Sequence, residues 1–114
     1  MDALLGKLKE IHYEELDIDE FIDLRENDPF DSEWVRVYRA IEGLKKGRDI
    51  KDAREIAEKA YLLVLKQSAS TDLAEFISDD FYMIADSKAL NYSDRWLDKL
   101  IACYENAVIP CGEL

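Results

Sequence analysis

The sequence predicts an all-α fold, a compact bundle of about five to six helices. Apolar residues recur at steps of three and four along most of the chain, which is the period of one face of a helix. No stretch has the two-residue alternation of a half-buried strand, and both prolines lie at or near helix edges. Of the 114 residues 48% are hydrophobic, enough for one core, so we expect a single helical domain over residues 1–114.

The first third of the chain predicts two short helices. Residues 2–11 place four apolar side chains on one face, although Gly6 weakens the helix. A second helix is expected from about Asp17 to Glu26, with Asp17 or Asp19 near the positive N-terminal end of its dipole. Pro29 follows the end of this helix.

The middle of the chain predicts two longer helices. The first runs from Glu33 to about Lys46, and its apolar face is formed by Trp34, Val37, Tyr38, Ile41 and Leu44. The second begins at Asp49, as the N-terminal cap, and ends near Lys66. Its run AYLLVL is apolar almost all round, so we expect this helix to be the most buried.

The segment from Ser70 to Pro110 predicts the last two helices, joined by a turn at Asn91. Ser70 and Ser93 are the expected N-terminal caps. The first of these helices carries acids and a tyrosine in one stripe, formed by Asp72, Glu75, Asp79, Tyr82 and Asp86.

That stripe works mildly against its own helix. Like charges at this spacing cost about 0.2–0.5 kcal/mol per pair, so the stripe is either neutralised by another part of the chain or kept for a partner. Asp80 falls on the opposite, apolar side of the same helix. We expect it to be structural and to need a lysine, an arginine or a tyrosine hydroxyl as its partner.

Charge narrows the class of partner. The chain has 26 acids and 15 bases, a formal charge of −11, which repels nucleic acid and anionic membrane surfaces and favours a basic protein. Residues 1–33 hold twelve acids against three bases and residues 67–114 nine against three, whereas residues 34–66 are basic. We expect bases such as Arg36 and Arg39 to pair with the acidic blocks rather than to bind phosphate.

The remaining composition predicts a cytoplasmic protein that is not an enzyme. The N-terminus lacks the pattern of a signal peptide, and no apolar run is long enough to span a bilayer. His12 is the only histidine, and no base lies near either cysteine, so no activated nucleophile is predicted. The acidic run from Asp17 to Asp23 lacks the glycine and glutamate of a calcium loop, because Ile22 and Asp28 occupy those positions. We therefore expect no metal and no cofactor.

A partner-binding surface is the remaining functional prediction, because acids steer a basic partner and rigid aromatic side chains anchor it. The candidate residues are Asp72, Glu75, Asp79, Tyr82, Asp86, Tyr92, Glu14, Glu15, Asp17, Asp19 and Asp23.

Three short motifs lie in the last third of the chain: SDDF at Ser78–Phe81, SDRWL at Ser93–Leu97, and Tyr104 followed by Ile109-Pro110. With them, this segment resembles the C-terminal half of small, acidic, all-helical immunity proteins from bacterial toxin–immunity pairs, including contact-dependent growth inhibition systems. The resemblance implies a cognate toxin domain, frequently a basic nuclease, that is bound tightly and blocked inside the producing cell.

A positive nuclease cleft gives such an inhibitor a mechanism, since an acidic surface can cover the active site or an adjacent exosite. The alternative is a helical adaptor or regulator that binds a basic protein or a peptide helix in a groove between its own helices. A groove of that kind needs a contiguous apolar patch, which an electrostatic inhibitor does not.

Overall fold

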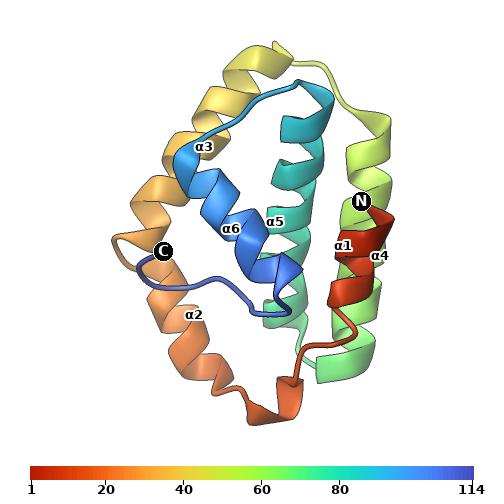
Figure 1. The fold of residues 1–114 in the computed structure, drawn as a ribbon, viewed down its shortest axis with the longest axis vertical. Helices are drawn as coiled ribbons and strands as arrows, with labels where there is room; N and C mark the ends of the chain where they lie inside the picture. Colours follow the sequence, from red (N-terminus) through yellow and green to blue (C-terminus); the bar gives the residue numbers. More distant parts are fainter.

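A computed structural model describes residues 1–114 and confirms the all-α prediction, with six α-helices, one 3-10 turn and no strands (Figure 1). The elements in chain order are α1 (Asp2–Lys7), the 3-10 turn η1 (Tyr13–Glu15), α2 (Ile18–Glu26), α3 (Phe30–Lys45), α4 (Lys51–Ser68), α5 (Thr71–Ala89) and α6 (Arg95–Glu105). None of these helices has both the length and the apolar character that crossing a bilayer requires.

Helix α5 lies at the centre of the bundle. Figure 1 shows it between α3 and α4, with α6 crossing in front of it. Side-chain contacts of α5 agree with this central position. The Ser78 hydroxyl donates to the carbonyl of Ala57 on α4, at 2.9 Å, and the Phe81 ring packs edge to face against Tyr104 of α6. Ten residues of α5 are buried. Its central position explains this burial, since neighbours cover it on several sides.

The prediction that residues 49–66 form the most buried helix is wrong. Only four residues of α4 are buried, three of them alanines, and Leu62 in its apolar run is exposed. Helix α4 is at the outside of the bundle, where it presents its small side chains to α5. An apolar run in the sequence favours burial of those residues, but the position of the helix in the bundle decides how many of them are covered.

A single apolar cluster of 22 buried residues draws side chains from every helix. The aromatic members pack edge to face, with Phe30 of α3 and Trp96 of α6 at 5.1 Å between ring centroids. Phe81 of α5 and Tyr104 of α6 lie at 4.9 Å in the same geometry. Helix α6 is thereby joined to both α3 and α5.

Two predicted caps differ from the observed ones. Ser70 caps α5 as expected, accepting a hydrogen bond from the backbone N–H of Leu73 at 3.2 Å. Helix α6, however, is capped by Asp94 rather than Ser93. Ile50 is the N-cap residue of α4, and the Asp49 carboxylate turns away to accept from Tyr82 and Arg54.

Asp94 is expected to stabilise the fold because it has two roles. Its carboxylate accepts from the N–H of Leu97 at 3.0 Å and from the guanidinium of Arg36 on α3 at 2.8 Å. Replacing Asp94 with alanine should lower the free energy of unfolding by about 1–2 kcal/mol, as measured by urea denaturation. The neighbouring Ser93→Ala is the control and should stay within about 0.5 kcal/mol of the wild type. Equal losses in the two variants would contradict the assignment of the cap.

Candidate partner-binding site

A buried ion pair joins α2 to α5 next to the candidate site. The guanidinium of Arg25 donates to both carboxylate oxygens of Asp80, each at 2.7 Å, and also to the carbonyl oxygen of Pro110 at 3.1 Å. Both side chains are buried. Two parallel N–H···O bonds are the strongest geometry for such a pair. The expectation that Asp80 is structural and has a basic partner is thereby confirmed.

Asp80 also collects donors from two further helices. The indole N–H of Trp34 on α3 donates to it at 2.9 Å, and the hydroxyl of Tyr104 on α6 at 2.5 Å. Burial lowers the pKa of Arg25, but the charges and hydrogen bonds of Asp80 and Tyr104 together outweigh burial and leave that pKa above its ordinary value. Burial and the same carboxylate raise the pKa of Tyr104. One carboxylate thus ties α2, α3 and α6 to α5, and it holds the Trp34 ring in place.

Helices α3 and α5 leave a cleft of about 410 Å³ between them, here called the α3–α5 cleft. Helix α3 contributes Trp34, Tyr38, Ile41, Glu42 and Lys45. Helix α5 contributes Asp79, Tyr82, Met83 and Asp86. Three residues of the predicted stripe therefore meet side chains of α3 that the sequence pattern had assigned to an apolar face.

The aromatic wall of the α3–α5 cleft is formed by Trp34 and Tyr38. Their rings are stacked, with centroids 5.4 Å apart and planes inclined by 14°. Tyr38 is 44% exposed in the free protein, whereas Trp34 is half-buried and fixed by its bond to Asp80. A rigid, partly exposed aromatic pair is typical of the anchors at the centre of protein interfaces.

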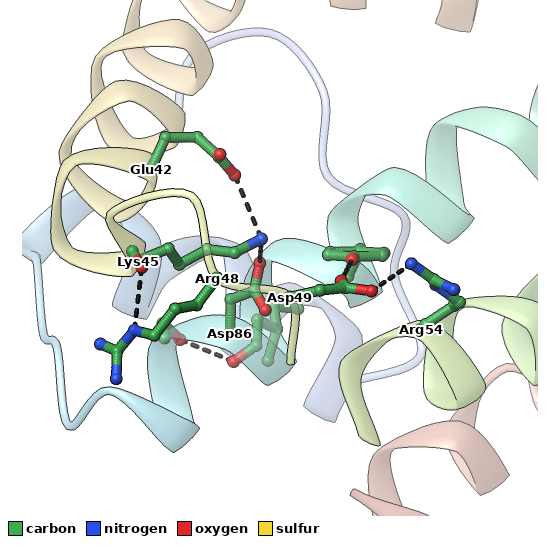
Figure 2. A network of polar contacts seen from close by, with 9 residues as sticks. Glu42, Lys45, Arg48, Asp49, Arg54 and Asp86 are labelled. Carbon is green, nitrogen blue, oxygen red and sulfur yellow. Dashed lines mark hydrogen bonds and ion pairs between the residues drawn. The ribbon is translucent and has the colours of Figure 1, made fainter. Parts of the chain in front are cut away.

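An ion pair from α3 to α5 forms the polar end of the cleft. The ammonium of Lys45 lies 3.0 Å from the Asp86 carboxylate and 3.3 Å from that of Glu42 (Figure 2). The prediction that Asp86 belongs to an exposed stripe is wrong, because the side chain is only 2% exposed. The last turn of the stripe faces α3, and Lys45 neutralises it there.

The Asp86 carboxylate is only half satisfied. Its Oδ1 is buried and has no hydrogen-bond partner, while Oδ2 accepts from Lys45. Burial raises the pKa of the Asp86 carboxyl even though Lys45 opposes the shift. For Lys45, burial lowers the pKa, but bonds to Asp86 and Glu42 outweigh burial and leave it raised. Burial thus decides the direction of the shift for Asp86, whereas the partners decide it for Lys45. The reason lies in the contacts, since the ammonium has two acidic partners and the carboxylate has one basic partner.

The rest of the α5 stripe is open to solvent. Asp72, Glu75 and Asp79 are exposed, and none of them forms an ion pair. Asp79 lies at the edge of the cleft, where partial burial and the nearby charges of Asp80 and Glu75 raise the pKa of its carboxyl. These three acids therefore remain available for a basic partner.

The other predicted site residues are in different places. Tyr92 is half-buried and packs against the core. The N-terminal acids Glu14, Glu15, Asp17, Asp19 and Asp23 are exposed on η1, α2 and the link between them. Asp17 is the N-cap of α2, accepting from the N–H of Glu20 at 3.1 Å. The structure thus separates the eleven candidates into five residues of α5, of which Asp86 is buried, five exposed N-terminal acids and one half-buried aromatic.

A second cleft lies beside the N-terminal acids, here called the α2–tail cleft. It is formed by η1, α2 and the segment after α6, and its apolar residues include Leu16, Phe21, Leu24, Val108 and Ile109. Glu15, Asp17 and Glu20 also line it.

His12 and its neighbours form the one cluster of metal-ligand side chains. Ligand atoms of His12, Glu14 and Glu15 lie within 4.8 Å of one another, and all three residues are exposed. His12 Nδ1 is 3.4 Å from the Glu14 carboxylate. Nothing else about this cluster points to a bound ion.

The aromatic half of the α3–α5 cleft was missed at the sequence level, although a signal was present. Trp34, Tyr38, Glu42 and Lys45 follow one another at steps of four, four and three along one face of α3. Charged side chains at the end of such a stripe are rarely buried in an apolar core. A stripe that changes from aromatic to charged residues therefore predicts a helix face that is covered at one end and open to solvent at the other.

Comparison with known proteins finds a family model that covers most of the chain. A family model described as Immunity protein PIM1 matches residues 4–111. No curated protein and no solved structure matches the chain. The family match includes every α-helix from α2 to α6 and both clefts, and it confirms the resemblance to small immunity proteins of toxin–immunity systems. The chain belongs to the immunity protein PIM1 family.

Proposed function

We propose that this immunity protein neutralises a basic toxin domain, a nuclease, by placing the α3–α5 cleft and the exposed acids of α5 over its active site or an adjacent exosite. Membership of the family implies a cognate toxin. The proposal adds the chemistry of that toxin and the surface that meets it. It also assigns the protein to the cytoplasm, as a binding protein rather than an enzyme.

One observation carries the proposal: a stacked aromatic pair lines the same cleft as Asp79, a carboxylate that the chain itself does not neutralise. Tyr38 is exposed and stacked on Trp34, and Asp79 lies across the cleft from them without an ion pair. Aromatic anchors supply most of the affinity of a tight interface, while acids speed the encounter with a basic partner to about 10⁸–10⁹ M⁻¹s⁻¹ at low salt. Both properties suit an inhibitor that must intercept a toxin quickly.

The contribution of the exposed acids can be tested by charge reversal. In the double variant Glu75→Lys/Asp79→Lys, we expect the association rate with the toxin domain to fall about tenfold or more at low salt, because steering weakens. The helical content and the melting temperature should stay nearly unaltered, since neither side chain has a partner in the fold. Stopped-flow mixing at several ionic strengths measures this rate.

A matched control is available on α4, which lies on the other side of α5 from α3 (Figure 1). Glu55 and Glu58 are exposed and form no ion pair, so Glu55→Lys/Glu58→Lys makes the same change of charge at a distance from the cleft. Equal loss of rate in both double variants would mean that only the net charge matters. An unchanged association rate in the α5 variant would mean that the interface lies elsewhere on the protein.

Toxin binding is expected to weaken on acidification. The pKa values of Asp79 and Asp86 are raised, so these carboxylates become neutral at a higher pH than ordinary aspartates and the cleft loses its attraction for a cation. Protonation of these two carboxyls does not unfold the protein and so does not explain the loss of binding in that way. Because folding raises their pKa values, the folded state becomes more stable, as far as these groups contribute, when the pH falls through those values. Calorimetric titration between neutral pH and pH 4 measures the effect. In Asp79→Asn, the decline should begin at a different pH from the wild type.

The adaptor function remains a second candidate because of the α2–tail cleft. Leu24 and Val108 are exposed large apolar side chains in that cleft, and acids lie beside them. This is the apolar patch that a groove for a peptide helix needs. If Leu24→Ser/Val108→Ser abolished partner binding while substitutions in the α3–α5 cleft did not, the adaptor function would replace the proposal above.

A further inference from the structure

The α3–α5 cleft already binds one cation, which belongs to the chain itself. The Lys45 ammonium lies between the carboxylates of Glu42 and Asp86 (Figure 2), and it is 5.1 Å from the centroid of the Tyr82 ring. Carboxylates together with the face of an aromatic ring are the surroundings that a cation prefers in a protein. The cleft therefore has the chemistry of a cation site, and Lys45 fills only one end of it.

The acid in the cleft exceeds what Lys45 neutralises. Three carboxylates line it, those of Glu42, Asp79 and Asp86, against a single lysine. Asp86 Oδ1 has no donor although the side chain is almost fully buried, and buried polar atoms in native proteins nearly always have one. Asp79 is unpaired at the edge of the cleft. A second cation, bringing its own donors, would complete these contacts.

The walls indicate which cation fits. Trp34 and Tyr38 offer stacked flat rings, and the bond from Trp34 to Asp80 holds the first of them in a fixed orientation. A planar guanidinium stacks on such a surface and carries five N–H donors, enough to reach more than one carboxylate. A lysine ammonium is compact and strongly hydrated, and it gains less from a flat aromatic wall.

We propose that the α3–α5 cleft is a binding site for one arginine side chain, which, on the proposed function, the toxin domain supplies. The guanidinium stacks against Trp34 and Tyr38 and donates to Asp79 and to the free oxygen of Asp86. Lys45 stays in place and holds the other oxygen of Asp86. A basic nuclease surface is rich in arginine, so the partner in the proposed function carries the required group.

The test uses the immunity protein alone with three small probes: N-acetyl-arginine amide, N-acetyl-lysine amide and the uncharged N-acetyl-citrulline amide. Titrations are followed by NMR at the indole N–H resonance of Trp34. The chain has two tryptophans, and the resonance that disappears in Trp34→Phe belongs to Trp34. We expect a saturable shift of this resonance and of the Asp86 side-chain carboxyl with the arginine probe. The lysine probe should bind more weakly, and the citrulline probe should cause no saturable shift.

Variants locate the site. Tyr38→Ala and Asp79→Asn should each weaken binding of the arginine probe by about tenfold, from the loss of stacking and of a charged acceptor. Asp72→Asn is the matched control, because it makes the same change of charge on the same helix outside the cleft, and it should bind as the wild type does.

Three results would overturn the arginine site: no saturable shift at Trp34, equal binding of the arginine and lysine probes, or equal losses in Asp72→Asn and Asp79→Asn. Because the toxin is absent from the titration, these failures are distinct from failure of the proposed function. A saturable arginine titration in a protein whose cleft variants still neutralise the toxin would overturn the proposed interface alone.

Discussion

Replacing Asp80 with alanine is expected to lower the free energy of unfolding by about 3–5 kcal/mol. The substitution leaves the Arg25 guanidinium buried without its counter-charge, and it removes the acceptor of Trp34 and Tyr104. A loss of that size is a large part of the roughly 5–15 kcal/mol that stabilises a typical domain. Urea denaturation, followed by circular dichroism, measures it.

Asp79→Ala is the control for this result. It makes the same chemical change one residue earlier on α5, at an exposed side chain without an ion pair, and should alter the free energy of unfolding by no more than about 0.5 kcal/mol. Similar losses in the two variants would mean that the effect comes from the helix itself and not from the buried network.

Truncating Tyr38 to alanine is expected to weaken toxin binding by about 2 kcal/mol, roughly 30-fold in the dissociation constant. Tyr38 provides the exposed ring of the stacked pair, so its removal takes away the outer half of the aromatic wall of the α3–α5 cleft. The fold should tolerate the change, because the side chain is 44% exposed. Calorimetric titration with the cognate toxin domain measures the dissociation constant.

Leu44→Ala provides a close comparison. Leu44 is on the same helix and is also 44% exposed, but it does not line the cleft. We expect its truncation to leave toxin binding nearly unchanged. If both truncations raised the dissociation constant by the same factor, the partner would contact the whole outer face of α3, and the cleft would have no special role in binding.

The two expected effects are linked through Trp34. Its indole N–H is bonded to Asp80 in the buried network, while its ring forms the inner half of the aromatic wall. The network therefore does more than join helices: it sets the position of a binding-site side chain before a partner arrives. Such preorganisation reduces the entropy lost on association.

Local features of the chain were predictable because they depend on neighbours in sequence. Helical periodicity predicted about five to six helices. Ser70 was identified as the N-terminal cap of α5, and Asp17 was one of two acids, with Asp19, expected at the start of α2. The same phase argument placed Asp80 on the buried side of α5. The alternation between acidic and basic blocks indicated ion pairs across the chain, and Arg36 does pair with Asp94.

The sequence by itself therefore determined the helices, the inward face of α5 and the need of Asp80 for a partner, since helical phase is a local property. Only the tertiary structure decided that this partner is Arg25, 55 residues earlier, and that Lys45 covers Asp86. Phase describes a side chain relative to the axis of its own helix and says nothing of where the next helix lies. For that reason helical phase placed Asp79, Tyr82 and Asp86 on one face of α5 but did not predict that Asp86 is buried or that Met83 joins them in a cleft. The α3 side of that cleft depends on how the two helices pack.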